Sequence, residues 1–245
     1  MPIERIDAAY QAKQNARIQS SLRRIDTRPA IPTGRVIPES GDLAIYDGRS
    51  LNATILFLDI CGFTSRPQET TQDQEQLLRA ISLFFSEMIR IIEDFGGTVE
   101  KNTGDGLMAY FVQTASDSFS VQQRALSAAL TMFHTAASSL NPHIERRGIA
   151  PFEFRICLDH GPVTIARVGA AKGFNDIVAI GTPANLACKM LHVAKSNEIM
   201  IGNAIALNLD AAWRTYIRAS AHNTGYHYTL SGQPYIYWYY LGRWT

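Results

Sequence analysis

One run of seven residues, Thr54–Ile60 (TILFLDI), limits most strongly what this chain can fold into. All but one of its side chains are apolar or β-branched, which predicts a strand buried on both faces of a sheet. The exception is Asp59, next to the end of the run. A buried carboxylate is costly unless it pairs with a cation or binds a metal. The run therefore predicts a central strand that ends on a salt-bridged aspartate or on a metal ligand.

Helical and strand patterns interleave after this run, which indicates an α+β domain. Residues Gln72–Phe95 carry one apolar stripe that stops at Gly96-Gly97, so we expect a long amphipathic helix. Strands at 98–101 and 107–112 flank a turn-forming segment, which predicts a hairpin. Further along we expect a helix over 117–139, strands at 152–158 and 163–168 around a turn at 159–161, a helix over 182–195, a strand at 198–201, a short helix near 203–210, and strands near 213–220, 226–230 and 234–241. The expected architecture is an antiparallel-containing sheet with helices packed on it.

The first 41 residues are expected to lie outside this domain. Residues 3–25 place sparse apolar side chains three or four apart, which predicts an exposed or partner-seeking helix, with a frayed polar tail as the alternative. Residues 28–41 contain three prolines and two glycines, a composition typical of a linker. We therefore divide the chain into an N-terminal helix and linker, 1–41, and a globular domain, 42–245.

Charge and cysteine usage exclude several classes of partner. The chain has 23 Lys and Arg against 22 Asp and Glu, so it lacks the overall positive field that holds nucleic acid. Its 3 cysteines are scattered, which fits a reducing compartment and argues against a disulfide framework. The N-terminus is charged, and no apolar run reaches the ~18 residues of a membrane span. We expect a cytoplasmic protein with no nucleic-acid or membrane partner.

Two aspartates and a turn suggest a phosphate and metal site. Gly62, Phe63 and Thr64 follow the central strand in a turn that leads toward a helix, where backbone N–H groups can cradle phosphate oxygens. Asp105 lies in the hairpin turn NTGDG and taken alone is typical of a turn residue. A hairpin beside the strand of Asp59 brings both carboxylates to one sheet edge. Such a pair can hold two Mg²⁺ or Mn²⁺ ions about 4 Å apart for phosphoryl transfer.

Four segments carry a resemblance to a known family. They are ILFLDICGFTS, GGTVEKNTGDGLMAYF, FRICLDHGPV and FNDIVAIGTPANLACKM. In this order and spacing they resemble the catalytic domain of class III nucleotide cyclases, the adenylate and guanylate cyclases, over roughly residues 50–202. The resemblance implies a ferredoxin-like α+β fold. It also implies a head-to-tail homodimer with two sites for a nucleoside triphosphate at its interface.

The resemblance assigns the residues that hold metal and phosphate. It makes Asp59 and Asp105 the ligands of two Mg²⁺ or Mn²⁺ ions, with the backbone carbonyl of Ile60 as a further ligand. Arg155 matches the arginine that contacts the triphosphate, where a cationic fork suits phosphate. The alternative for Arg155 is a strand-edge arginine in a salt bridge.

The opposite subunit is expected to supply Lys101, Asn185 and Lys189. Asn185 matches the asparagine that orients the ribose. Lys189 stands where the family usually has an arginine that stabilises the transition state. Lysine keeps the charge of that arginine but loses its planar fork, so rate or geometry is expected to differ.

Two positions bear on the choice of base. Lys101, four residues before Asp105, matches the lysine of adenylate cyclases, where guanylate cyclases carry glutamate. Val178 stands where adenylate cyclases carry an Asp or Thr that accepts from the adenine amino group. Valine cannot accept, and an unpaired buried donor costs about 1–3 kcal/mol. A lysine donor without an opposite acceptor fits the carbonyl oxygens of uracil. The alternative is that Val178 only packs against the base while backbone groups read it.

The lead-in to the central strand points to the same base. RVIPESGDLAIYDGRSLNATILFLDI is similar to the entry segment of the bacterial pyrimidine cyclases of the Pycsar anti-phage systems, which make cUMP or cCMP for a separate effector protein. The expected activity is therefore a uridylate cyclase that makes cUMP and pyrophosphate from UTP as an anti-phage signal. The alternatives are an adenylate cyclase that makes cAMP and a cyclase-like regulatory module that binds nucleotide.

Overall fold

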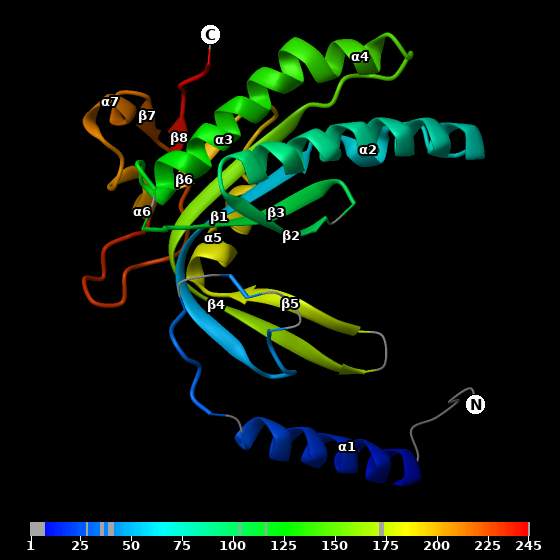
Figure 1. Cartoon of the computed structure of the whole chain (residues 1–245), viewed down its shortest axis with the longest axis vertical. Coiled ribbons are helices and arrows are strands. Elements are labelled where there is room, and N and C mark those ends of the chain that lie inside the picture. Colours follow the sequence, from blue (N-terminus) through cyan, green and yellow to red (C-terminus); the bar gives the residue numbers. More distant parts are fainter. Residues whose placement is uncertain are drawn as a thin grey trace.

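The computed structural model describes residues 8–27, 29–34, 37–38, 42–102, 104–115, 117–171 and 174–244. Figure 1 shows a strongly curved sheet with helices on both faces and one helix apart from it. The elements follow in the order α1 (Ala8–Asp26), β1 (Gly48–Ile60), α2 (Thr71–Asp94), β2 (Gly97–Asn102), β3 (Gly106–Val112), α3 (Val121–Thr135), α4 (Asn141–Glu145), β4 (Phe154–Ala171), β5 (Phe174–Ile180), α5 (Thr182–Met190), β6 (Ile199–Gly202), α6 (Asn203–Ala206), α7 (Ala211–Arg214), β7 (Ile217–Ala219) and β8 (Tyr237–Tyr240).

The central strand of the sheet is β1, as its apolar run predicts. It pairs antiparallel with β3 on one side and with β4 on the other. The described strands follow the order β2-β3-β1-β4-β6-β8-β7, with β5 paired to β4, and β4 pairs with β6 in parallel. The predicted α+β class and the antiparallel-containing sheet are confirmed.

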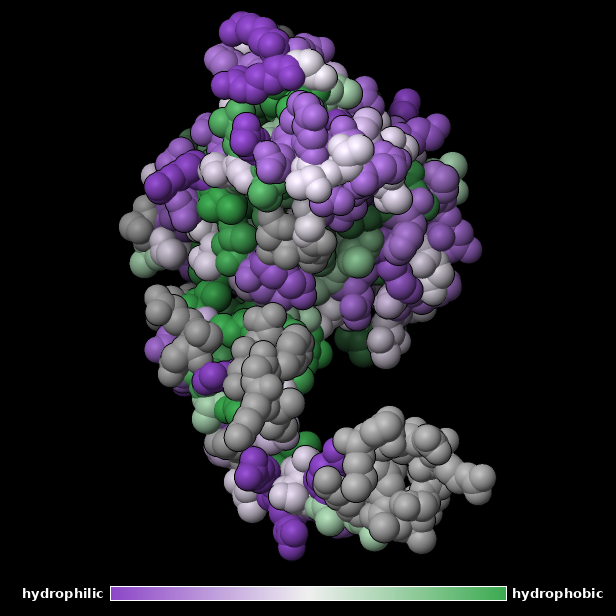
Figure 2. Space-filling view, turned by 90° about the vertical axis from the view of Figure 1, so that its right-hand side faces the viewer, coloured by the Kyte–Doolittle hydropathy of each residue, from purple (hydrophilic) through white to green (hydrophobic). Residues whose placement is uncertain are grey.

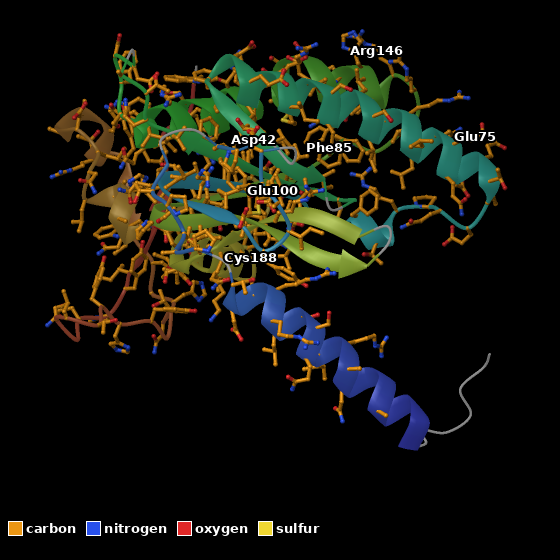
Figure 3. All side chains as sticks on the ribbon, turned by 60° about the horizontal axis from the view of Figure 1, so that its bottom comes forward. Asp42, Glu75, Phe85, Glu100, Arg146 and Cys188 are labelled. Atoms are coloured by element: carbon orange, nitrogen blue, oxygen red, sulfur yellow. The ribbon has the colours of Figure 1, made fainter. Side chains whose placement is uncertain are left out.

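Side chains alternate along β1 and build a separate core on each face of the sheet. Leu56 and Leu58 pack on the face covered by α2 and α3, whereas Ile55 packs on the face covered by α5. Figure 3 labels Phe85 on α2 and Cys188 on α5, on opposite sides of the sheet. Asp59 has the same odd parity as Ile55, so its side chain belongs to the α5 face.

The start of α2 follows from its capping sequence. Thr70 accepts a hydrogen bond from the backbone N–H of Asp73, and the Asp73 side chain accepts one from the backbone N–H of Thr70. This capping box satisfies two backbone donors that would otherwise lack partners. The helix ends at Asp94, before a left-handed Gly96. The helix predicted over 72–95 is confirmed.

The largest error in the predicted elements concerns β4. The turn expected at 159–161 is absent, because β4 runs unbroken from Phe154 to Ala171. Asp159 is accommodated inside the strand because its carboxylate accepts hydrogen bonds from the Tyr235 hydroxyl and from the backbone N–H of His160. The hairpin partner β5 was not predicted.

Smaller errors concern the helices and the C-terminal strands. The helix expected over 117–139 is divided into α3, a π-helical turn at Ala136–Leu140 and α4, and the helix expected to reach 195 ends at Met190. The strand expected at 213–220 consists of α7 followed by β7. The segment 226–230 forms no strand, because Tyr228 bonds to Gln233 and Gly232 to close a turn.

The helix α1 projects from the body of the protein. It lies apart from the sheet in Figure 1, and Figure 2 shows that purple hydrophilic residues and green hydrophobic residues share the visible face of the body. Ile18, Leu22 and Ile25 on this helix are 51%, 43% and 46% exposed. Within the linker, Pro32 and Gly34 form backbone hydrogen bonds with Ser50 of β1. Among the described residues, no helix is both long enough and apolar enough to cross a membrane.

Candidate active site

The two candidate metal ligands lie at one edge of the sheet. Asp59 is opposite Gly106 in the ladder between β1 and β3, and Asp105 precedes Gly106 directly. The backbone N–H of Ile60 donates to the carbonyl of Asp105 over 2.8 Å. This bond uses the backbone of Asp105 and leaves its carboxylate for other partners. The hairpin therefore brings the two aspartates together, as the sequence predicts.

Arg155 is the cross-strand neighbour of Asp59. The two residues face each other in the ladder between β1 and β4. The Nε and Nη2 atoms of Arg155 donate to Oδ2 of Asp59 over 2.8 and 2.6 Å, and Nη1 donates to the carbonyl of Ala194 over 2.9 Å. The side chains are 28% and 21% exposed, respectively. The salt bridge, which was the alternative for Arg155, is the arrangement that the structure contains.

The oxygen atoms at this edge suit a hard divalent cation. Mg²⁺ and Mn²⁺ prefer carboxylate and carbonyl oxygens, and Asp59, Asp105 and the Ile60 carbonyl are donors of this kind. Among the described residues, both hydrogen bonds to the Asp59 carboxylate reach Oδ2. The described residues contain no group of three or more His, Cys, Asp or Glu side chains suited to a metal. A metal bound here would therefore rely on two carboxylates and on oxygens of the backbone, substrate or water.

The turn after β1 begins with a left-handed glycine. Gly62 has φ 64 and precedes a 3₁₀ turn at Phe63–Ser65. The backbone N–H of Cys61 donates to the carbonyl of Glu153, which ties the start of the turn to the residue directly before β4. The first N–H groups of such a turn have no partner within it. Gly62, Phe63 and Thr64 therefore present backbone N–H groups in the turn that follows the strand of Asp59.

Lys101 lies at the end of β2, on the same hairpin as Asp105. The pairing of β2 with β3 shifts register between Val99 and Lys101, so Glu100 forms a bulge. The Nζ atom of Lys101 is 3.1 Å from Oε1 of Glu100, and the Lys101 side chain is 39% exposed. Lys101 is therefore partly free to meet a ligand.

Asn185 and Lys189 share one exposed face of α5, because a spacing of four residues places side chains on the same side of a helix. The opposite face of α5 buries Leu186 and Met190. The Nζ atom of Lys189 is 4.5 Å from the ring centroid of Tyr226. Asn185 and Lys189 therefore extend from one side of a helix whose other side packs on the sheet.

Val178 lies far from the aspartates of its own chain. It pairs with Ala166 on β4, which in turn pairs with Gly48, whereas Arg155 pairs with Asp59. The eleven steps from Gly48 to Asp59 correspond to roughly 36 Å measured along the curved strand. Within one chain the structure therefore brings Asp59, Asp105, Arg155 and the turn at 62–64 together and does not bring Val178 to them.

The sequence analysis missed a buried polar pair behind the site. Asp159 is 1% exposed, and burial raises its pKa to about 7, against hydrogen bonds from Tyr235 and His160 that lower it. Burial also raises the pKa of the Tyr235 hydroxyl, and the nearby Asp159 adds to this rise. A carboxylate that follows the apolar residues ICL was the signal, because a buried carboxylate is costly unless it has a partner.

The family model of the adenylate and guanylate cyclase catalytic domain matches residues 45–240. This match covers most of the chain, and the paired aspartates and the turn after β1 lie inside it. The chain belongs to the adenylate and guanylate cyclase catalytic domain family.

Individual relatives carry more specific names. The chain is 30% identical over 158 residues to a cytidylate cyclase of Staphylococcus aureus. This match covers 63% of this chain and 37% of that protein. It is 26% identical over 165 residues to a uridylate cyclase of Rhodovulum sp. (strain MB263), which covers 64% of this chain and 65% of that protein. The chain thus matches less than two thirds of the length of either relative.

Solved structures confirm the fold. The crystal structure of the guanylyl cyclase Cya2 superposes with a TM-score of 0.65 and 20% identity, over 80% of this chain and 95% of that chain. At this identity the likeness concerns the fold alone.

Proposed function

We propose that this chain is a nucleotide cyclase that converts a pyrimidine ribonucleoside triphosphate, most readily UTP, to its 3′,5′-cyclic monophosphate and pyrophosphate. The observation that carries this proposal is the placement of Asp59 and Asp105 at one sheet edge, within the matched cyclase domain. Arg155 and the backbone donors at 62–64 lie beside them. Together these groups offer negative charge for cations and positive charge for phosphate.

Asp59, Asp105 and the carbonyl of Ile60 would hold two Mg²⁺ or Mn²⁺ ions. When bound, such ions neutralise the triphosphate and ease deprotonation of the ribose 3′-hydroxyl. The 3′-oxygen then attacks the α-phosphorus in line, the bond to the β-phosphate oxygen breaks, and pyrophosphate leaves. Arg155 leaves its salt bridge with Asp59 to hold the leaving phosphates, while N–H groups at 62–64 orient them.

The complete site is proposed to need two copies of the chain. Val178 is held, through Ala166 of β4, at the end of β1 opposite to Asp59. A second copy in head-to-tail arrangement supplies Lys101, Val178, Asn185 and Lys189 to the aspartates of the first. A two-fold interface of this kind gives two equivalent sites.

The choice of a pyrimidine rests on Lys101 and Val178. The Lys101 ammonium is a donor with no acceptor counterpart at Val178, which suits the carbonyl oxygens of uracil better than the amino group of adenine. The names of the relatives in Staphylococcus and Rhodovulum, cytidylate and uridylate cyclase, support a pyrimidine product.

The direct test is to incubate the purified protein with each of the four ribonucleoside triphosphates in Mn²⁺ and in Mg²⁺. The products are identified by mass. We expect cUMP to form fastest. Preference for ATP would indicate an adenylate cyclase. The absence of every cyclic product would favour a regulatory module that binds nucleotide.

The role of Val178 is tested by Val178→Asp, which places an acceptor opposite the Lys101 donor. We expect kcat/KM for ATP to rise relative to kcat/KM for UTP. The change in this ratio should correspond to about 1–3 kcal/mol, the usual effect of pairing a buried polar group. Val178→Leu serves as the control that changes size without adding an acceptor. An unchanged ratio in Val178→Asp would show that Val178 does not read the base.

We further propose that the cyclic nucleotide is a signal read by a separate effector protein in a cytoplasmic anti-phage response. The similarity of the lead-in to β1 with the pyrimidine cyclases of such systems supports this role. We also propose that residues 1–41 form a helix and a linker and that residues 42–245 form the catalytic domain.

A further inference from the structure

We propose that Tyr226 is a positioning residue, whose ring holds the Lys189 ammonium in the orientation that it needs opposite the aspartates of a second copy. This inference rests on the proposed cyclase function and adds a residue from outside the four segments that resemble the family. It concerns the irregular stretch 220–236 between β7 and β8, here called the C-terminal strap. A connection of this length without regular structure is uncommon in a compact domain unless it has a function.

The contact itself joins a flexible cation to an aromatic face. Nζ of Lys189 lies 4.5 Å from the ring centroid of Tyr226, within the range of a cation–π interaction. Lys189 is on the exposed face of α5, where a four-carbon side chain would otherwise sample many rotamers. Tyr226 therefore restricts Lys189 without neutralising its charge.

Buried contacts fix the position of the strap. The backbone N–H of Tyr235 donates to the carbonyl of Tyr226, and the Thr224 hydroxyl donates to the carbonyl of Tyr235. The Tyr235 hydroxyl in turn donates to the buried Asp159 of β4 and accepts from the backbone N–H of Ala204. These bonds connect Tyr226 to the centre of the sheet, so its ring is a fixed surface for Lys189.

This arrangement compensates for the absence of an arginine. A guanidinium fork is pre-organised by its planar geometry, whereas an ammonium on a flexible side chain is not. The aromatic face of Tyr226 limits the positions of the Lys189 ammonium and so supplies part of the pre-organisation that lysine lacks. The strap thus offers a reason why lysine is compatible with catalysis at this position.

The kinetic test compares Tyr226→Leu with Tyr226→Phe. Phenylalanine keeps the aromatic face and leucine removes it, so we expect Tyr226→Phe to retain the wild-type kcat. We expect Tyr226→Leu to lose between about twofold and thirtyfold in kcat, the range of cation–π interactions from exposed to desolvated sites, with little change in KM. Tyr216→Leu, at an exposed tyrosine outside the strap, is the matched control. Equal kcat values for Tyr226→Leu and the wild type would overturn the inference.

A second readout does not depend on activity. In the wild type, the ring current of Tyr226 should shift the Cε protons of Lys189 upfield in NMR spectra, and Lys189→Arg identifies their signal. We expect the shift to persist in Tyr226→Phe and to vanish in Tyr226→Leu. A shifted signal in a protein that forms no cyclic nucleotide would refute the proposed function and leave the contact intact. An unshifted signal in an active enzyme would refute the inference alone.

Discussion

Asp105 is the residue whose backbone and side chain have separate tasks. Its carbonyl accepts from the N–H of Ile60 and closes the sheet edge, so the hairpin does not depend on the carboxylate. We predict that Asp105→Asn keeps the fold and lowers the rate of cyclic nucleotide formation by about 100-fold or more, because an electrostatic group of the transition state is lost. Asp94→Asn, at an exposed aspartate at the end of α2, is the control.

Rates of cyclic product formation decide this prediction, together with the thermal midpoints of both variants. More than about a tenth of the wild-type rate in a folded Asp105→Asn protein would rule out a metal-binding role for this carboxylate. The same measurement applies to Asp59→Asn, in which the loss of the salt bridge with Arg155 is expected to lower the midpoint as well.

Asp159 makes stability depend on pH in a direction opposite to that of most aspartates. Burial raises its pKa from 3.8 to about 7, so the folded protein keeps the proton after the unfolded chain has lost it. Its contribution to folding is therefore complete below about pH 4 and is lost as pH rises toward 7, by about 4 kcal/mol in total. Asp159→Asn keeps the acceptor oxygen and removes the titration.

We predict that the free energy of unfolding of the wild type falls more than that of Asp159→Asn between pH 5 and pH 7, by about 2 kcal/mol. Urea unfolding at the two pH values measures both proteins. Parallel pH dependences in the two proteins would contradict a buried, protonated Asp159.

The contrast between Asp59 and Asp159 shows how far residue patterns reach. The placement of Asp59 and Asp105 at one sheet edge was predictable, because a strand and a neighbouring hairpin define that edge. The ion pair between Asp59 and Arg155 appeared only as an alternative, since the register between β1 and β4 comes from contacts distant in sequence. Asp159 was taken for a turn residue because its partner, Tyr235, is 76 positions away along the chain.

At the scale of elements, the packing of β4, β6 and the C-terminal strap leaves no space for a side chain at Gly202. A Cβ atom there would overlap the Asp159 carboxylate and lie 2.6 Å from the Tyr235 hydroxyl. We predict that Gly202→Ala destabilises the fold by about 1–3 kcal/mol, the usual cost of overpacking. Chemical denaturation measures this cost. A free energy of unfolding within about 0.5 kcal/mol of the wild type would show that the packing around Gly202 can relax.

Local periodicity located the long elements well and the short ones poorly. The helix α2 has a capping box, an apolar stripe and a glycine stop, and all three agree. The strand β5 lacked such agreement, because FNDIVAI is short and its place in the sheet depends on its pairing with β4. The segment 226–230 has strand-like residues but is held in a turn by Gln233 and Gly232.

For the whole molecule, the decisive feature is the proposed division of the candidate site. The aspartates, Arg155 and the turn at 62–64 occupy one end of β1, whereas Val178 pairs with Ala166 of β4, which pairs with the other end of β1. In the proposed homodimer, a two-fold axis would bring these opposite ends together. Activity is therefore expected to require association, and the rate per chain should fall on dilution below the dissociation constant of the dimer.

The most direct test of a divided site mixes two inactive variants. Asp59→Ala disables the metal-binding end and Asn185→Ala disables the opposite end, so a heterodimer of the two contains one intact site and one doubly damaged site. We predict that each variant alone forms no cyclic nucleotide above about a tenth of the wild-type rate, and that mixing them restores activity in proportion to the heterodimer present. No recovery in a mixture shown to contain heterodimers would contradict the divided site and place the whole reaction within one chain.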